Sequence, residues 1–263
     1  MEDVLFERKD QVEIITLNRP QALNCFNNEI LYALTRRFAE LHQDDDCRAV
    51  VITGAGRGFC TGADLTGGGA RADAATPVGM RLTTHIYSAV IRGLTTMEKP
   101  VIAAINGDAA GAGCNFALAC DIIVASEKAR FIQVFVRRGL VVDMGGTFFL
   151  PRLVGLSKAK ELAFSGEAID AQKALELGLV SKVVPHENLM DEAMEMARVL
   201  AQGPTRAIGM IKRMLNRSFE TDLETALEME ASLQGIAVST PDVVEGITSF
   251  LQKKQARFTG KSC

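Results

Sequence analysis

Three short apolar runs constrain the fold of this chain most strongly, because each has the length of a buried strand and is separated from the next by a segment of helical character. The runs are AVVITG (49–54), VIAAI (101–105) and IIVA (122–125). None alternates polar with apolar residues, which is typical of strands in a parallel sheet covered on both faces. The alternation of such strands with helices predicts an α/β fold with largely parallel strand pairing.

The N-terminal segment predicts a hairpin followed by a helix. Two β-rich runs, VLFER (4–8) and VEIITLN (12–18), are separated by the turn-like sequence KDQ. Asn27 can cap the helix that follows. That helix carries an apolar stripe at helical spacing, formed by Leu31, Leu34, Phe38 and Leu41.

After residue 155 the predicted secondary structure is mostly helical, because only VSKVV (180–184) still has the pattern of a strand. The remaining segments are bounded by proline or glycine and have helical character. We therefore expect a core over residues 1–200 and a helical region over residues 201–263. Helices that are apolar on more than one face need a partner, so this region predicts contacts between copies of the chain.

Charge and cysteine content argue against several classes of partner. The 263 residues carry a formal net charge of -3 and the longest basic groupings are pairs, so we expect neither nucleic acid nor a membrane as partner. The six cysteines lack C-x-x-C spacing and the three histidines have no partner at ligand spacing, which predicts reduced thiols and no metal site. The N-terminal MEDVLFERKD lacks the apolar core of a signal peptide, and no run reaches the ~18 apolar residues of a membrane span. The predicted location is therefore cytoplasmic.

Two glycine-rich turns follow predicted strands, in FCTGADL (59–65) and NGDAAGAGCNFAL (106–118). Such turns expose backbone N–H groups that the sheet does not use, and the second opens a helix whose first amides are unpaired. Two such sets of amides, if they converge on one oxygen atom, form an oxyanion hole. It is equally open that both turns only connect elements. A dinucleotide site fits less well, because the pattern G-x-G-x-x-G fails at Phe116.

A single carboxylate, Asp143, lies in GLVVDMGGT (139–147) between apolar residues and a glycine turn. A carboxylate in apolar surroundings loses hydration, so Asp143 is a helix cap, a paired structural group or a proton carrier with a shifted pKa. The neighbours Val141, Val142 and Met144 would raise its pKa, whereas the amides of a helix opening at Gly145 would lower it. The sequence leaves open which effect is larger.

Four motifs together resemble the enoyl-CoA hydratase/isomerase (crotonase) family. They are LNRPQALNCF (17–26), FCTGADL, INGDAAGAGCNFALACDIIVAS (105–126) and GLVSKVVP (178–185), and they span nearly the whole chain in the family's order. The resemblance implies a spiral of ββα units with a C-terminal helical trimerisation region, and a homotrimer or dimer of trimers. It also implies an acyl-CoA thioester as substrate, with no further cofactor.

The same resemblance implies the residues of the site. The backbone N–H groups of Ala63 and Ala112 would form the oxyanion hole. The acyl group would lie against residues 66–76 and 80–87, where apolar size sets preference. The loops that contact CoA would carry Ala22, Leu23, Asn24, Gly62, Asp64 and Leu65, and the substrate pocket would include Gly111, Asn115, Phe135 and Val142.

Two positions depart from the family's hydratases, which use a pair of glutamates to activate water. Asn115 and Phe135 occupy these positions here, and neither can act as a base. Asp143 remains, and with FLPRLVG (149–155) downstream its context resembles the 1,2-epoxyphenylacetyl-CoA isomerase branch of the family. The prediction is an isomerase in which Asp143 is the single general acid/base and Ala63 and Ala112 stabilise an enolate.

Three further functions stay open at this point. In an aryl-CoA dehalogenase Asp143 would be the nucleophile, but the tryptophan of that branch is absent and Phe135 lies at its place. The second is an enoyl-CoA hydratase-like lyase, and the third is a catalytically degenerate acyl-CoA binder. If Asp143 is only a helix cap, the catalytic carboxylate has to be sought first at Asp64 and Asp108.

Overall fold

Two sheets form the centre of the molecule. The computed structural model describes residues 2–65 and 76–261. Within them, the larger sheet has the order β1 (Val4–Lys9), β2 (Val12–Leu17), β3 (Ala49–Gly54), β5 (Val101–Ile105), β7 (Ile122–Ser126) and β10 (Lys182–Val184). In this sheet the predicted β1–β2 hairpin is antiparallel, and the other neighbours are parallel. The smaller sheet has the order β4 (Gly58–Cys60), β6 (Asp108–Ala110), β8 (Arg130–Ile132) and β9 (Ala168–Asp170).

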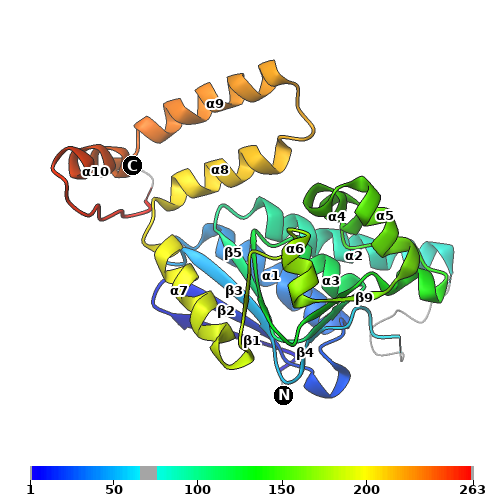
Figure 1. The fold of residues 1–263 in the computed structure, drawn as a ribbon. Helices are drawn as coiled ribbons and strands as arrows, with labels where there is room; N and C mark the ends of the chain where they lie inside the picture. The colour runs from blue at the N-terminus through cyan, green and yellow to red at the C-terminus, as the bar shows by residue number, and fades with distance from the viewer. Residues whose placement is uncertain (1, 66–75, 262–263) are drawn as a thin grey trace.

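Helices connect and cover these strands (Figure 1). Asn27 caps the first helix as predicted, because its side-chain oxygen accepts a hydrogen bond from the Ile30 N–H, and the predicted apolar stripe of that helix is buried. The α-helices are α1 (Asn28–Gln43), α2 (Pro77–Thr96), α3 (Ala112–Leu118), α4 (Gly146–Val154), α5 (Leu156–Ser165), α6 (Ala171–Glu176), α7 (Leu189–Ala201), α8 (Thr205–Arg217), α9 (Leu223–Val238) and α10 (Pro241–Leu251). Three short 3-10 helices are η1 (Pro20–Ala22), η2 (Val134–Arg138) and η3 (His186–Asn188).

The chain repeats one unit of two strands and a helix. In the units β3–β4–α2 and β5–β6–α3, the first strand belongs to the larger sheet and the second to the smaller one. The smaller sheet was not predicted from the sequence, because its strands are only three residues long. The result is the predicted α/β fold, a spiral of ββα units followed by C-terminal helices.

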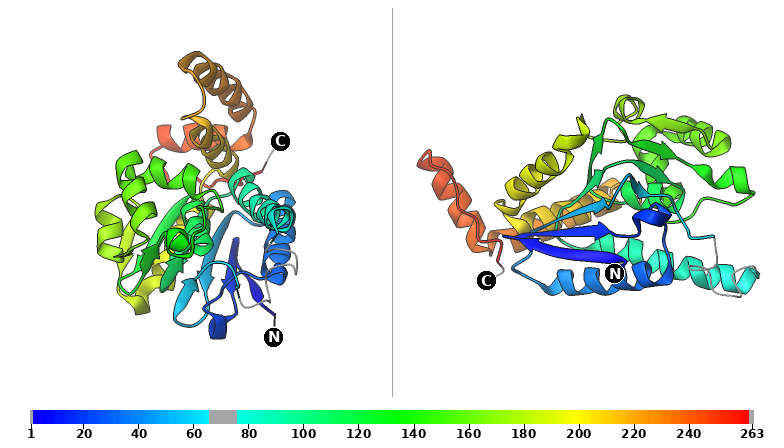
Figure 2. Two further views of the ribbon diagram at one scale, coloured as in Figure 1. Left: turned by 90° about the vertical axis from the view of Figure 1, so that its right-hand side faces the viewer. Right: turned by 90° about the horizontal axis from the view of Figure 1, so that it is seen from below.

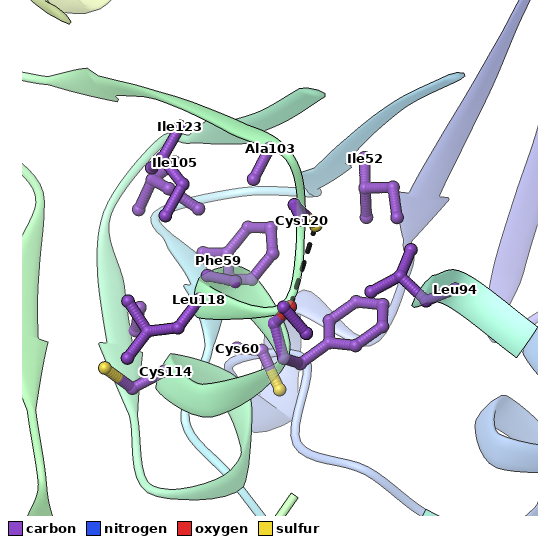
Figure 3. Close-up of a cluster of buried hydrophobic side chains, with 14 of the residues drawn as sticks. Ile52, Phe59, Cys60, Leu94, Ala103, Ile105, Cys114, Leu118, Cys120 and Ile123 are labelled. Atoms are coloured by element: carbon purple, nitrogen blue, oxygen red, sulfur yellow. Dashed lines mark hydrogen bonds between the residues drawn. The ribbon is translucent and has the colours of Figure 1, made fainter. Parts of the chain in front are cut away.

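The larger sheet is covered on both faces, as its continuous apolar strands predict. On one face, α7 packs its buried alanines and leucine onto β2, β3, β5 and β7. The other face belongs to a larger cluster that also takes in α1, α2, α3 and the smaller sheet. Figure 3 shows part of this cluster, where Phe59 and Leu118 lie beneath Ala103 and Ile105 of β5.

The last three helices, α8 to α10, extend beyond one end of the sheets (Figures 1 and 2). The division predicted between residues 200 and 201 falls at the last residue of α7. No helix among the described residues is long and apolar enough to span a membrane. Many apolar side chains on α8 to α10 are exposed in the single chain: Ile211, Leu215, Leu223, Leu227, Ile236, Val238, Val244, Ile247, Phe250 and Leu251.

Candidate active site

The first glycine turn directs the amide of Ala63 away from its neighbouring strand. Ala63 forms an isolated parallel bridge with Phe26. The Phe26 N–H donates to the Gly62 carbonyl at 2.7 Å, and the Asp64 N–H donates to the Phe26 carbonyl at 2.9 Å. In a parallel bridge the two residues that flank the bridged one make the hydrogen bonds, so the N–H of Ala63 itself points to the other side.

The second turn places the amide of Ala112 beside the first. Ala112 is the first residue of α3, so its N–H has no acceptor within the helix. Gly62 and Gly111 have φ values of 99° and 53°, in the left-handed region that glycine tolerates. A Cβ on Gly62 would lie 3.1 Å from the Ala110 carbonyl oxygen and 3.5 Å from the Ala112 nitrogen. The two turns are therefore in contact, with one outward-pointing amide on each.

Asp143 lies in the turn between η2 and α4, and it is not a helix cap. Met144 and Gly145 both have positive φ, so α4 begins only at Gly146, behind Gly145 as N-cap and without a side-chain cap bond. The Asp143 carbonyl accepts a hydrogen bond from the Gly146 N–H at 2.9 Å. Its carboxylate oxygen Oδ1 is buried and has no hydrogen-bond partner among the described residues. This finding excludes the cap interpretation.

Desolvation determines the pKa of Asp143. Burial raises the pKa from 3.8 to about 7, and no contribution from the amides of α4 opposes it. Of the residues expected to bury Asp143, Met144 is itself buried, at 3% exposed. The prediction is wrong for Val141, whose side chain is 86% exposed. Val142 is half-buried. A carboxyl group with a pKa near neutrality can both accept and release a proton at physiological pH.

The side chain of Asn115 holds the Asp143 turn in place. Asn115 is fully buried on α3, and its Nδ2 donates to the Asp143 carbonyl at 2.8 Å. Its Oδ1 accepts from Gln133 Nε2 at 2.8 Å. Each end of the amide thus has a protein partner, and Asn115 supports the turn that carries Asp143. Gln133 was not predicted from the sequence, because it belongs to no motif and its buried position follows only from the fold.

Phe135 lies next to the oxyanion turn. It is the buried residue of η2, and its ring atom Cζ is 3.7 Å from the position that a Cβ on Gly111 would take. Because Gly111 immediately precedes Ala112, the aromatic ring forms an apolar wall beside the second amide. The fold thus brings Gly111, Asn115 and Phe135 together with the turn that carries Asp143.

The loops expected to contact CoA are fixed by buried polar side chains. Asn24 donates from Nδ2 to the Ala55 and Gly58 carbonyls at 2.9 and 2.8 Å, and its Oδ1 accepts from the Arg19 N–H. Asp64 forms an ion pair with Arg19 at 2.9 Å, which ties the two loops together. The side chains of Asn24 and Asp64 therefore point into the protein, and only their backbones remain for contact with a ligand.

The remaining predicted positions fall in three places. Ala22 ends η1, Leu23 follows it with a positive φ, and the Leu65 side chain is exposed. Residues 66–75 of the expected acyl pocket lie outside the described residues.

Asp108 binds Arg130 through both carboxylate oxygens at 2.7 and 2.6 Å. Asp64 and Asp108 are thus both paired with arginines, whereas Asp143 Oδ1 has no partner among the described residues.

Comparisons with known proteins agree with this architecture. Residues 7–261 match the family model for enoyl-CoA hydratase/isomerase. The 1,2-epoxyphenylacetyl-CoA isomerase of Escherichia coli (strain K12) is 40% identical over 262 residues, which cover 99% of this chain and 100% of that protein. The short-chain-enoyl-CoA hydratase of Clostridium acetobutylicum is 38% identical over 256 residues, with 97% of each chain covered. The crystal structure of enoyl-CoA hydratase from Bacillus anthracis superposes with a TM-score of 0.92 at 32% identity, covering 98% of this chain and 100% of that one.

Proposed function

The chain belongs to the enoyl-CoA hydratase/isomerase family of acyl-CoA enzymes, and within this family we propose that it is an acyl-CoA isomerase. The relatives include both isomerases and hydratases, so membership alone does not distinguish the two reactions. The proposal depends instead on the acid/base groups of the site. Asp143 is the single carboxylate that we assign to proton transfer.

In the proposed reaction, the thioester oxygen of the substrate accepts hydrogen bonds from the N–H groups of Ala63 and Ala112. The Asp143 carboxylate removes a proton from the acyl chain, and the electrons of the broken C–H bond move toward the thioester oxygen, giving an enolate. Each oxyanion donor contributes about 10²- to 10³-fold in rate in well-studied enzymes. The protonated Asp143 then returns the same proton to another carbon, so the double bond moves and no atom is gained or lost.

One observation carries this proposal: the buried Asp143 Oδ1 has no hydrogen-bond partner among the described residues, and the turn that bears it is bound to α3, the helix that begins at Ala112. A structural carboxylate at this depth would be paired with a cation or an N–H group. Hydration would in addition need a group that activates water. The positions of the two hydratase glutamates hold Asn115, which is bonded to the Asp143 carbonyl and to Gln133, and the apolar Phe135.

The proposal also covers the cofactor requirement, the location and the assembly of the protein. Proton transfer and enolate stabilisation require no group beyond the protein and the CoA thioester, so we propose that no separate cofactor takes part. We also propose that the chain works in the cytoplasm as a homotrimer or dimer of trimers. The exposed apolar side chains of α8 to α10 support such an assembly.

A panel of thioesters tests the reaction directly. Purified protein is incubated with 3-enoyl-, 2-enoyl-, epoxyphenylacetyl- and 4-chlorobenzoyl-CoA, and the products are followed by mass spectrometry and ultraviolet absorbance. We expect rearrangement without a change of mass for at least one thioester, and loss of this activity by about 10²- to 10⁴-fold in Asp143→Asn. Addition of water as the fastest reaction, release of chloride, or full activity of Asp143→Asn would contradict the proposal.

A further inference from the structure

Tyr87 lies on the inner face of α2, beside the Asp143 turn. It belongs to the buried stripe of this helix and is 5% exposed. One helical turn further on, the Cγ2 atom of Ile91 lies 3.7 Å from the position that a Cβ on Gly145 would take. Residues four apart share a face of a helix, so Tyr87 and Ile91 point to the same side. Because α2 packs there on the turn after Asp143, Tyr87 reaches the region of the carboxylate.

The hydroxyl group of Tyr87 has no hydrogen-bond partner in residues 2–65 and 76–261. The ring of Tyr87 is buried, but its hydroxyl oxygen is not among the buried atoms that lack a partner, so this hydroxyl stays accessible and can donate to a bound molecule. Asp143 does not supply a partner, since its buried Oδ1 is itself unpartnered among the described residues. A potential donor and a potential acceptor thus lie near each other, and each lacks a partner from the described protein.

Burial and the neighbouring carboxylate of Asp143 keep the Tyr87 hydroxyl protonated. Burial raises the pKa of the Tyr87 phenol, and the negative charge of Asp143 adds to the rise. Tyr87 therefore lies within electrostatic range of Asp143. At neutral pH it offers an O–H donor to whatever occupies the region of this carboxylate.

We propose that the Tyr87 hydroxyl donates a hydrogen bond to an oxygen atom on the acyl group of the substrate. This inference rests on the proposed acyl-CoA chemistry and names a substrate class within it: acyl groups that carry a hydroxyl, ether, epoxide or carbonyl oxygen. A purely hydrocarbon acyl group that displaced water from this region would leave the Tyr87 hydroxyl without a partner. Sites that hydrogen-bond a substrate group discriminate against analogues that lack it, because the protein group is then left unpaired.

The test compares acyl-CoA ligands that differ by one oxygen atom. Binding is measured by calorimetry for phenylacetyl-CoA against its 2-, 3- and 4-hydroxy derivatives, and for hexanoyl-CoA against 3-hydroxyhexanoyl- and 5-oxohexanoyl-CoA. We expect the wild type to bind at least one oxygenated ligand about 5- to 50-fold more tightly than its hydrocarbon partner. Tyr87→Phe should abolish this preference and leave the affinity for the hydrocarbon ligands unchanged or higher.

Two controls make the result specific. Tyr87→Phe removes only a hydroxyl that has no partner in the described protein, so the variant should fold, which a thermal melt checks. Tyr32→Phe alters the other tyrosine, which is exposed on α1, and should keep the wild-type preference. The inference is overturned if the wild type shows no preference across the panel, or if Tyr87→Phe retains it. Turnover of 3-hexenoyl-CoA, measured in parallel, tests the proposed isomerase function separately, because these binding measurements do not depend on any conversion.

Discussion

At the scale of single residues, Asp143 links the stability of the protein to its proposed activity through one protonation equilibrium. As a general base it has to be ionised, and burial raises its pKa to about 7. We therefore expect kcat/KM for isomerisation to rise about tenfold per pH unit below pH 7 and to level off above it. A pH profile between 5 and 9 checks this expectation. A profile that is flat across pH 7 would assign the proton transfer to another group.

The same pKa predicts how stability changes with pH. The folded-state pKa of about 7 lies above the ordinary value of 3.8, so between these values the folded protein holds a proton that the unfolded chain has released. The contribution of Asp143 to the free energy of unfolding is then greatest at low pH. It falls as the pH rises toward 7, by at most about 4 kcal/mol in total. Asp143→Asn has no such penalty and should melt higher than wild type at pH 8, but not at pH 4. Melting curves with the same difference at both pH values would show that Asp143 is not desolvated.

The sequence identifies Asp143 as a candidate catalytic residue, but it does not predict the backbone conformation of the turn that carries Asp143. A carboxylate before a Gly-Gly-Thr sequence usually caps a helix. Here Met144 has a φ of 49°, which few residues other than glycine adopt, and the helix starts three residues after Asp143. This conformation depends on contacts with α3 that are distant in the sequence, so local patterns cannot predict it. The hydrogen bond from Asn24 to the Gly58 carbonyl and the ion pair between Asp64 and Arg19 are unpredictable from local sequence for the same reason.

At the scale of elements, the hydrogen bond between Asn115 and the Asp143 carbonyl joins α3 to the turn before α4. Asn115→Ala should lower kcat by about tenfold or more with little change in KM, because a small displacement of a catalytic group is costly. Since Asn115 acts through Asp143, the loss should not appear when Asn115→Ala is added to Asp143→Asn. A double-mutant cycle measures this coupling. Additive losses in kcat would show that Asn115 has a separate role in the reaction.

The turns that follow β4 and β6 contact each other, and this contact positions the two proposed oxyanion donors. In Gly62→Ala the new methyl group would lie 3.5 Å from the Ala112 nitrogen, in a backbone with a φ of 99°. We expect turnover to fall by about 10²-fold, the range seen when one oxyanion donor is removed. Gly139→Ala is the matched control, because Gly139 also has a positive φ but has no atom within 4 Å of its added Cβ. Equal losses of activity in both variants would attribute the effect to backbone strain alone.

Much of the element order could be predicted from hydrophobic patterns, and the exceptions have physical reasons. Apart from β10, the strands of the larger sheet are five or six residues long, and the apolar runs of β3, β5 and β7 are evident in the sequence. The strands β4, β6 and β8 have three residues each, too few to show a period. Their pairing depends on the parallel neighbours that the spiral brings together. The small sheet nevertheless matters for the site, because the glycine turns follow β4 and β6.

At the scale of the whole molecule, the C-terminal helices present an apolar surface that the single chain does not cover. Phe250 on α10 is 81% exposed, and Leu223 on α9 and Leu215 on α8 are also exposed. Monomeric proteins rarely expose contiguous apolar patches of large area, and such patches commonly mark contacts between proteins. Closed symmetric assemblies of identical chains are the usual outcome for soluble oligomers. Because the family resemblance implies a trimer or a dimer of trimers, we expect the wild type to sediment as one of these at micromolar concentration.

Charge substitutions on this surface test the assembly. Phe250→Asp combined with Ile247→Asp should shift the protein toward smaller species in analytical ultracentrifugation, because each carboxylate would have to be desolvated in a closed interface. Val141→Asp is the matched control, since Val141 is 86% exposed in the turn before α4 and belongs to none of α8 to α10, and it should leave the assembly intact. Circular dichroism should show unchanged helix content in all variants. A wild type that sediments as a monomer, or charged variants that assemble as well as Val141→Asp, would show that α8 to α10 do not join the subunits.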